Sequence, residues 1–343
     1  FPKNQKALSG LRALSRGSIN KNLIIQDPNR FQMKLLINLQ FQGQFQKALS
    51  KASKLLREFP NSPELYNHIG IANKQLGKLD EAITAYKRAI SIKVNFAQAY
   101  LNMGIALAEQ GIISEARASF KKAIEYKSDY AQAMWNLSGN AENIIEAKSW
   151  IEKCLSVDPN YEVAKLTLCA LDYYQGSKES FNSLLQSSLK KHSYTRSFSW
   201  VFELPSLPEL FFHRWALFDR MVQLSNKDKP FYEFGVWRGE AFKYLIKTFK
   251  KGYGFDTFEG IPEDWHNEKA GSYTSQGVIP KIKGGEFIAG KFEDTLPKFF
   301  SEAKPMASII NFDADLYSST ICALKGASSV IDQKTILIFC LLY

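Results

Sequence analysis

The fold of the second half of the chain is decided by the stretch FYEFGVWRG, residues 231–239. Two related stretches follow it, YGFDTFEGIP at residues 253–262 and NFDADLY at residues 311–317. Each combines a short apolar run with a glycine or an acidic residue at its end. This pattern is typical of the carboxyl ends of parallel strands that border a nucleotide site in an open α/β sheet. The sequence therefore predicts an α/β domain with a ligand site at one edge of its sheet.

The first stretch carries glycines where a ligand would approach the backbone. We expect a strand over residues 231–236 and a helix over residues 240–249, with Gly235 and Gly239 between them. Glycine lets the backbone come close to a ligand because it has no side chain. Trp237, however, stands where the dinucleotide fingerprint G-x-G-x-x-G needs its second glycine. This argues against a nicotinamide-dependent oxidoreductase, which is the weakest of the functions that the sequence leaves open.

Acidic residues follow two of the other expected strands. Asp256 lies at the end of a strand expected over residues 252–258, where a carboxylate can accept hydrogen bonds from both hydroxyls of a ribose. Its alternative role is a turn or a helix cap. Asp313 and Asp315 follow a strand expected over residues 308–312. We expect Asp315 to cap the next helix and Asp313 to face the ligand site.

The remaining elements complete an open sheet. We expect a third strand over residues 286–289, a helix over residues 317–330 and a fifth, apolar strand over residues 335–342. Residues 263–280 form a long loop rich in Gly, Ser and Trp, and loops of this length are often lids. His266 lies in this loop and is interpreted as a solvated residue in preference to a base.

The order and content of the three stretches resemble the class I S-adenosylmethionine-dependent methyltransferases. The closest resemblance is to the macrocin O-methyltransferase family of sugar O-methyltransferases, whose first motif has the same E-x-G-x-x-x-G form. The resemblance implies a Rossmann-like domain that binds S-adenosyl-L-methionine and methylates a sugar or glycan hydroxyl. The cofactor-binding residues that it implies are Glu233, Gly235, Gly239, Asp256, Thr257 and Phe292.

The same resemblance gives Asp313 a catalytic role. In the family the matching aspartate binds a divalent metal, expected to be Mg²⁺, and helps to deprotonate the acceptor hydroxyl. Such a cation would acidify and orient the hydroxyl, and alignment with the methyl group would supply most of the acceleration. The family closes its fifth strand on paired acids, whereas this chain has CLLY at residues 340–343. We therefore expect a C-terminally incomplete domain with poor metal binding and slow methyl transfer.

The first half of the chain is repetitive. Gly43, Gly77 and Gly111 are spaced by 34 residues, and Ala48, Ala82 and Ala116 repeat with the same spacing. A 34-residue period with small residues at fixed phase is typical of tetratricopeptide repeats, which have two antiparallel helices per unit. The clearest unit covers residues 63–96, and related units cover about 29–62, 97–130 and 131–161. We predict an all-α solenoid over residues 29–178, preceded by a partial repeat over residues 1–28.

Such an array leaves a concave groove that can bind a protein partner. We interpret the aromatic residues at the repeat positions as packing residues that fill the gaps between neighbouring units: Tyr66, Tyr86, Tyr100 and Phe120. Groove residues would instead be polar residues of the first helices, such as Asn67, Asn73, Lys74 and Asn102.

An aromatic-rich connector over residues 179–229 joins the repeats to the α/β domain, which we expect over residues 230–343. Leu204-Pro-Ser-Leu-Pro208 breaks any helix there. After it, Phe211, Trp215, Phe218 and Val222 fit one face of a helix. We expect this face to pack in a core, with a lid or an acceptor-site wall as the alternative.

Composition excludes several other classes. The chain has 343 residues and a net charge of +10, but its basic residues form no patch that would indicate nucleic-acid binding. Its apolar runs are too short for a membrane span. The four cysteines have no paired spacing, which predicts reduced thiols in a cytoplasmic protein. The leading hypothesis is a methyltransferase carried by a repeat platform; the alternative is a protein-binding scaffold whose methyltransferase domain is inert.

Overall fold

The computed structural model describes residues 27–265 and 268–339. They belong to two compact units, and the chain passes from one to the other between Ala133 and Met134, inside one helix. The expected partial repeat over residues 1–28 lies almost entirely outside the described residues, and so do His266 and the tail from Cys340. Within the described part, no helix is both long and apolar enough to cross a membrane.

The first unit is built from helix pairs, as the 34-residue period predicts. Its helices are α2 (Arg30–Phe41), α3 (Phe45–Glu58), α4 (Pro63–Gln75), α5 (Leu79–Ile92), α6 (Ala97–Glu109) and α7 (Ile113–Tyr126). Gly43, Gly77 and Gly111 form the turns inside successive pairs, with φ of 69°, 72° and 84°. This left-handed conformation favours glycine, which explains why the glycines recur at one phase.

Large aromatic rings pack against glycines within each pair. The buried ring of Tyr86 in α5 covers Gly70 of α4, and the buried ring of Phe120 in α7 covers Gly104 of α6. A Cβ atom on either glycine would lie only 2.3 Å or 2.5 Å from the facing ring carbon. The packing role expected of these two aromatics is confirmed. Their contacts with the glycines lie inside one repeat, however, and not between neighbouring repeats, because the missing Cβ makes room for the ring.

The second unit begins with further helices. They are α8 (Ala131–Ser138), α9 (Ile144–Val157), α10 (Glu162–Tyr174), α11 (Glu179–Leu185), the 3-10 helix η2 (Ser188–Lys191), α12 (Ser193–Phe202) and α13 (Arg214–Leu224). Helices α10 and α11 pair around Gly176, so helical pairing continues past Ser177, where the sequence period is lost. Phe202 of α12 stacks on Tyr173 of α10 with ring centres 3.9 Å apart, and α12 ends before the predicted break.

The rest of the second unit is an α/β domain with a parallel sheet. Its strands are β1 (Phe231–Phe234), β2 (Gly252–Asp256), β3 (Gly285–Ala289), β4 (Ile309–Phe312) and β5 (Ile336–Phe339), in the spatial order β3-β2-β1-β4-β5. The helices are α14 (Glu240–Leu245), α15 (Phe292–Phe299), α16 (Tyr317–Gly326) and the 3-10 helix η3 (Ala327–Val330). Every predicted strand is present, and most are shorter than predicted.

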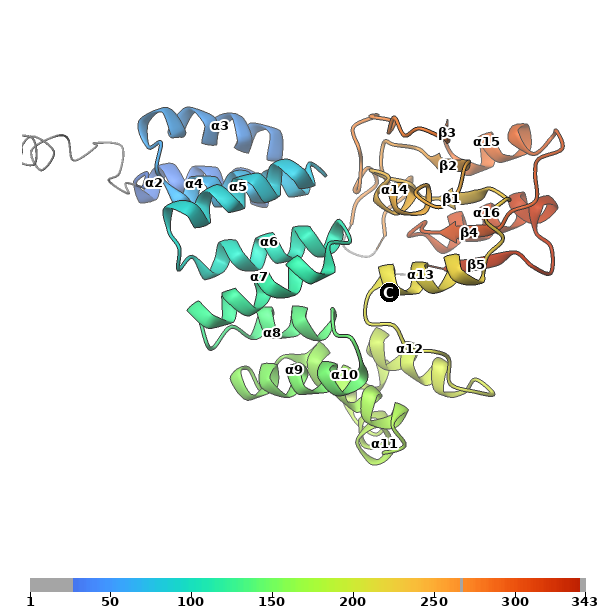
Figure 1. Ribbon diagram of the computed structural model, residues 1–343, viewed down its shortest axis with the longest axis horizontal. Helices are drawn as coiled ribbons and strands as arrows, with labels where there is room; N and C mark the ends of the chain where they lie inside the picture. The colour runs from blue at the N-terminus through green and yellow to red at the C-terminus, as the bar shows by residue number, and fades with distance from the viewer. Residues whose placement is uncertain (1–26, 266–267, 340–343) are drawn as a thin grey trace, which may run out of the picture. The chain divides into compact units, whose positions relative to one another are not determined.

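Helices cover both faces of this sheet (Figure 1). Phe231 of β1 packs on Phe242 of α14, with ring centres 4.7 Å apart. Phe234 points to the opposite face and packs edge-on against Phe292 of α15 at 5.7 Å. Because successive strand residues point to opposite faces, Glu233 lies on the same face as Phe231.

A ladder of phenylalanines crosses the sheet near the carboxyl ends of its strands. Phe255, Phe234, Phe312 and Phe339 are in-register neighbours on β2, β1, β4 and β5. Their rings are stacked with centres 4.8–5.4 Å apart. The residues that follow the first three rungs are Asp256, Gly235 and Asp313. The ladder therefore sets these residues in one row at the sheet edge.

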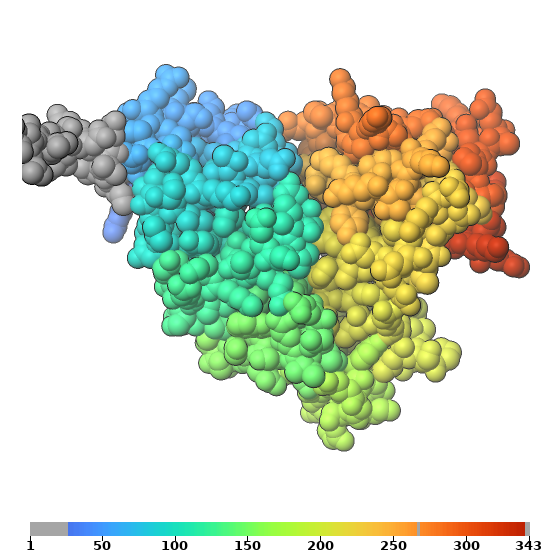
Figure 2. Space-filling model, in the orientation of Figure 1, coloured from blue at the N-terminus to red at the C-terminus, as the bar shows by residue number. Residues whose placement is uncertain are grey.

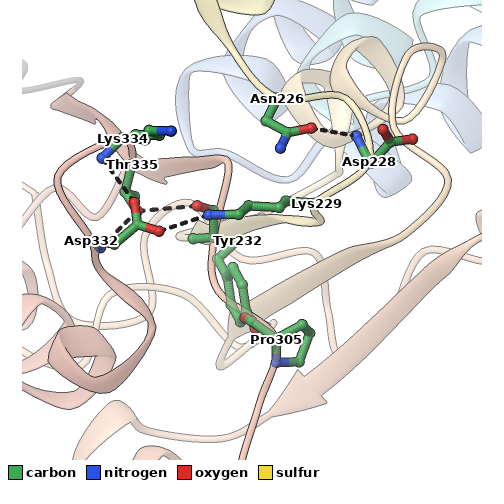
Figure 3. A network of polar contacts seen from close by, with 9 residues as sticks. Asn226, Asp228, Lys229, Tyr232, Pro305, Asp332, Lys334 and Thr335 are labelled. Carbon is green, nitrogen blue, oxygen red and sulfur yellow. Dashed lines mark hydrogen bonds and ion pairs between the residues drawn. The ribbon is translucent and has the colours of Figure 1, made fainter.

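The opposite, amino-terminal edge is closed by a polar network (Figure 3). Lys229, just before β1, forms a 2.7 Å ion pair with Asp332 in the turn before β5. The Asp332 carboxylate also accepts a hydrogen bond from the backbone N–H of Lys334. These contacts lower the pKa of Asp332 to about 2, the bond from Lys229 having the largest effect. The ion pair thus links the segments that lead into β1 and β5.

Candidate functional site

Four acidic side chains gather at the carboxyl edge of the sheet. Glu233 comes from β1, Asp256 from the end of β2, and Asp313 and Asp315 from the segment after β4. The charges of Asp313 and Asp256 both raise the pKa of Glu233, and the charge of Asp256 raises the pKa of Asp315. The structure thus brings together Glu233, Asp256 and Asp313, which the sequence had placed at one site.

Glu233 is the most deeply buried of the four, with 1% of the residue exposed. Burial is the main reason why its pKa lies well above the usual range, followed by the nearby charge of Asp313. Arg214 lowers the pKa of Glu233, and so does the side chain of Asn311, which is the in-register neighbour of Glu233 on β4. Among the described residues, nothing donates a hydrogen bond to Oε2 of Glu233. A buried oxygen without a donor is costly, so a ligand donor would be stabilised here.

Asp313 is partly exposed and carries a pKa raised to about 6. Burial is again the largest cause, and the charges of Asp315 and Asp256 add to it, whereas Arg214 lowers the pKa. The guanidinium Nη1 of Arg214 lies 3.9 Å from Oδ2 of Asp313. A carboxyl group with this pKa is mostly ionised at neutral pH and can still accept a proton from a substrate.

Asp256 ties two loops together. Its Oδ2 accepts a 2.7 Å hydrogen bond from the N–H of Trp237, and its Oδ1 accepts a 2.6 Å bond from the N–H of Phe258. The second bond is the turn role that the sequence offered as an alternative. Its pKa is nevertheless raised, because burial outweighs these bonds. Each carboxylate oxygen keeps a further lone pair, so ribose binding by Asp256 stays a prediction.

The two glycines expected at the cofactor site, Gly235 and Gly239, have different surroundings. Gly235 has a φ of +91°, and a Cβ there would lie 2.3 Å from the backbone oxygen of Asp313. This glycine therefore allows the ends of β1 and β4 to meet. Gly239 precedes α14 at a φ of +77° and faces the side chains of Pro280 and Ile282. A ligand that contacts Gly239 would therefore also contact Pro280 and Ile282, in the loop before β3.

The other two expected cofactor residues are engaged within the protein. The hydroxyl of Thr257 donates a 2.7 Å bond to the backbone oxygen of Gly260 and accepts one from the N–H of Glu259. The ring of Phe292 is buried in the core beside Phe234, which leaves little of it for contact with an adenine. Their cofactor contacts remain predictions.

Backbone strain is concentrated around this edge. Trp237, Phe258, Tyr273 and Gln276 are the non-glycine residues with positive φ in the described part, at +50° to +59°. All of them lie after β1 or in the long loop after β2. Each such conformation costs about 1–3 kcal/mol, and strain of this kind gathers at ligand sites. Trp237 is 39% exposed and meets Tyr273 edge-on at 6.3 Å.

One expectation about the acids fails, and the metal role expected of Asp313 stays a prediction. Asp315 does not cap α16, because the capping position is Leu316 and no side chain bonds the helix end there. In residues 27–265 and 268–339, no three His, Cys, Asp or Glu side chains are grouped so that they could hold a metal. The partner of Asp313 is instead the cation Arg214. The described residues therefore do not fit the divalent metal that the resemblance implied.

Sequence reasoning missed Arg214. It is the first residue of α13, whose Trp215 and Phe218 are buried and pack against Tyr244 of α14 with ring centres 4.6 Å and 6.1 Å away. The core role predicted for Trp215 and Phe218 is confirmed. In Figure 2 the yellow atoms of α13 lie directly against the orange atoms of the sheet domain. The aromatic stripe was a signal that α13 packs there, but nothing in the sequence links Arg214 to Asp313.

The polar residues expected in the groove of the repeats hold neighbouring helix pairs together. Asn67 is buried and accepts a 2.9 Å hydrogen bond from Asn102 of the next pair. Lys74 forms a 2.7 Å ion pair with Glu109, also of the next pair. Asn73 is buried as well. Because these groups bridge helix pairs, they are less available to a partner than the sequence indicated.

Comparisons with known proteins identify the repeats. A family model described as "TPR repeat" matches residues 74–111, and one described as "Tetratricopeptide repeat" matches residues 97–130. Residues 74–130 therefore carry tetratricopeptide repeats. No curated protein matches the chain.

Solved structures resemble about half of the chain. Residues 41 to the end of MamA from Desulfovibrio magneticus RS-1 are 18% identical, cover 50% of this chain and 100% of their own, and give a TM-score of 0.42. PilF of Pseudomonas aeruginosa is 17% identical over 49% of this chain and 87% of its own, with a TM-score of 0.43. A thermophilic TPR protein of Thermus thermophilus is 18% identical over 51% of this chain and 99% of its own, with a TM-score of 0.38.

Proposed function

We propose that the α/β domain is an S-adenosylmethionine-dependent O-methyltransferase for a sugar or glycan hydroxyl, and that the repeats bind a protein partner. The observation that carries the first part is the acidic row at the sheet edge, Glu233, Asp256 and Asp313, beside the cation Arg214. The second part is supported by the tetratricopeptide repeats, an architecture that presents binding surfaces to proteins.

The charge of the site favours this cofactor over a dinucleotide. The strand order reverses between the paired strands β1 and β4 near the centre of the sheet, and open parallel sheets bind nucleotides at such a reversal. A pyrophosphate would bring negative charge toward Glu233, Asp256 and Asp313, which already repel one another. S-adenosylmethionine has no phosphate and carries an ammonium and a sulfonium. The unbonded Oε2 of Glu233 offers an acceptor for the ammonium.

The residues of the chain suggest how a hydroxyl would be methylated. S-adenosylmethionine, when bound, supplies an electrophilic methyl group. The hydroxyl oxygen of the acceptor would attack that methyl group while Asp313 accepts the hydroxyl proton. The raised pKa of Asp313 makes its carboxylate a stronger base. Asp256, through Trp237 and Phe258, would hold the two loops that border the ligand. Accurate alignment of the hydroxyl would supply most of the acceleration.

A second candidate is a scaffold with an inert α/β domain. It is favoured by one observation: the described residues offer no group that could hold the metal used by the resembled family. Binding of S-adenosylhomocysteine without any methyl transfer to sugar acceptors would support the scaffold.

Asp256→Asn tests the cofactor site. An amide cannot serve both N–H donors and a ribose as the carboxylate can, so we expect affinity for S-adenosylhomocysteine to fall by about 1.5–3 kcal/mol. Isothermal titration calorimetry measures this. Asp228→Asn is the matched control, because the Asp228 side chain is exposed and forms a 3.8 Å pair with Lys250. Unchanged binding in the Asp256 variant would refute the ribose assignment.

Binding should also depend on pH. The pKa of Asp313 is raised to about 6, so protonation below that pH removes a negative charge next to the cationic ligand. Affinity for S-adenosylmethionine is therefore expected to fall as the pH drops from 7 to 5, with proton uptake by the free protein competing with the ligand. Calorimetry across this range is the measurement. Asp313→Asn should flatten the dependence near pH 6; an unchanged slope would show that Asp313 is not responsible.

A further inference from the structure

Arg214 occupies an unusual position for a cation. It is the first residue of α13, so its charge lies at the positive end of the helix dipole, where cations are disfavoured by about 0.3–1 kcal/mol. Its guanidinium lies over the ring of Trp215, with its central carbon 4.5 Å from the ring centre. Trp215 is buried, so this contact ties the guanidinium to a side chain that is itself held in the core. The arginine is thus held in place against an unfavourable helix field.

The described residues leave the hydrogen-bonding capacity of the Arg214 guanidinium unused. Its Nη1 lies 3.9 Å from Oδ2 of Asp313, which is an ion pair but too long for a hydrogen bond. Among the residues that the structure describes, none accepts a hydrogen bond from the guanidinium. A guanidinium has five N–H donors in a planar fork, which matches a carboxylate with two parallel bonds. The fork is partly exposed beside the acidic row.

We propose that Arg214 binds the α-carboxylate of the methionine portion of the cofactor and so selects ligands with an intact α-amino acid. The inference rests on the proposed function. An α-amino acid carries a carboxylate and an ammonium on one carbon atom. Arg214 matches the first, and Oε2 of Glu233 matches the second. One cation beside a buried acid is the complement of that zwitterion.

The alternative is that Arg214 only neutralises Asp313 and Glu233. The two roles predict different effects for ligands that differ by one carboxylate. If Arg214 only neutralises the acids, its removal changes the site for every ligand with an ammonium. If it binds the carboxylate, only ligands with that group lose affinity. Without Arg214 the acids attract an ammonium more strongly, so a ligand that lacks the carboxylate would bind at least as well as before.

The test compares S-adenosylhomocysteine with its decarboxylated analogue, S-adenosyl-3-thiopropylamine, by calorimetry on the full chain. We expect Arg214→Ala to weaken S-adenosylhomocysteine about tenfold to hundredfold, the scale for lost charged hydrogen bonds, and to leave the analogue unchanged or tighter. Arg214→Lys keeps the charge but loses the fork, and should recover only part of the affinity. Arg220→Ala is the matched control, because Arg220 lies on the same helix and pairs with the exposed Glu209.

Two outcomes overturn the proposal, and they are distinct. Equal losses for the two ligands in Arg214→Ala would refute carboxylate binding and leave the proposed function standing. Failure of the unaltered chain to bind S-adenosylhomocysteine would refute both. The thermal melting temperature of each variant, measured without ligand, separates unfolding from a loss of contacts.

Discussion

Replacing Gly70 by alanine is expected to destabilise the repeat unit by up to about 2 kcal/mol. The added Cβ would lie 2.3 Å from Cε1 and 2.6 Å from Cδ1 of the Tyr86 ring. That ring is fully buried, so it cannot move aside without displacing its neighbours. Overpacking of this kind typically costs 1–3 kcal/mol, and it opposes the gain of roughly 1 kcal/mol that alanine has over glycine in a helix. Urea unfolding followed by circular dichroism measures the net effect.

Changes at Tyr86 provide the controls. The Tyr86 hydroxyl is buried, and no described residue forms a hydrogen bond with it. Tyr86→Phe should therefore be neutral or stabilising, because it removes a buried polar group without a partner. Combining Gly70→Ala with Tyr86→Leu should be less harmful than the sum of the two single changes, since the smaller side chain makes room for the Cβ. Simple additivity would contradict the proposed clash.

The sheet was predictable because the residues at the ends of its strands follow a recognisable sequence pattern. Phe255-Asp256 and Phe312-Asp313 repeat one pattern, an aromatic residue inside and an acid directly after it. In-register pairing of parallel strands then turns this pattern into a row of acids. Residues that follow strands at one sheet edge are neighbours whatever their separation along the chain. The acidic edge was therefore accessible from the sequence alone.

The partners of those acids were not predictable in the same way. Arg214 reaches Asp313 from a helix that precedes the sheet, and such a contact depends on how α13 packs and not on any spacing. The carboxylate of Asp256 binds two backbone N–H groups, and backbone donors carry no sequence signal. In the repeats, Asn67 and Asn102 lie on the first helices of successive pairs, as expected, but the hydrogen bond between them depends on the packing of neighbouring pairs.

Gly235→Ala is expected to have the largest effect in the α/β domain. The residue has a φ of +91°, and the new Cβ would lie 2.3 Å from the backbone oxygen and 2.6 Å from the carbonyl carbon of Asp313. Backbone atoms cannot rotate away as a side chain can, so relief requires the end of β1 to separate from β4. The backbone conformation costs about 1–3 kcal/mol, and the clash adds to it, for a total of roughly 3 kcal/mol or more.

A second glycine separates these two costs. Gly271 has a φ of +87° but no atom within 4 Å of an added Cβ, so Gly271→Ala carries the conformational cost alone. The difference between the two variants in urea unfolding then gives the energy of the clash. Because Gly235 sets the distance between the ends of β1 and β4, its variant should also lose S-adenosylhomocysteine binding, whereas the Gly271 variant should keep it. Equal destabilisation by the two changes would show that the close contact between Gly235 and Asp313 does not hold this edge together.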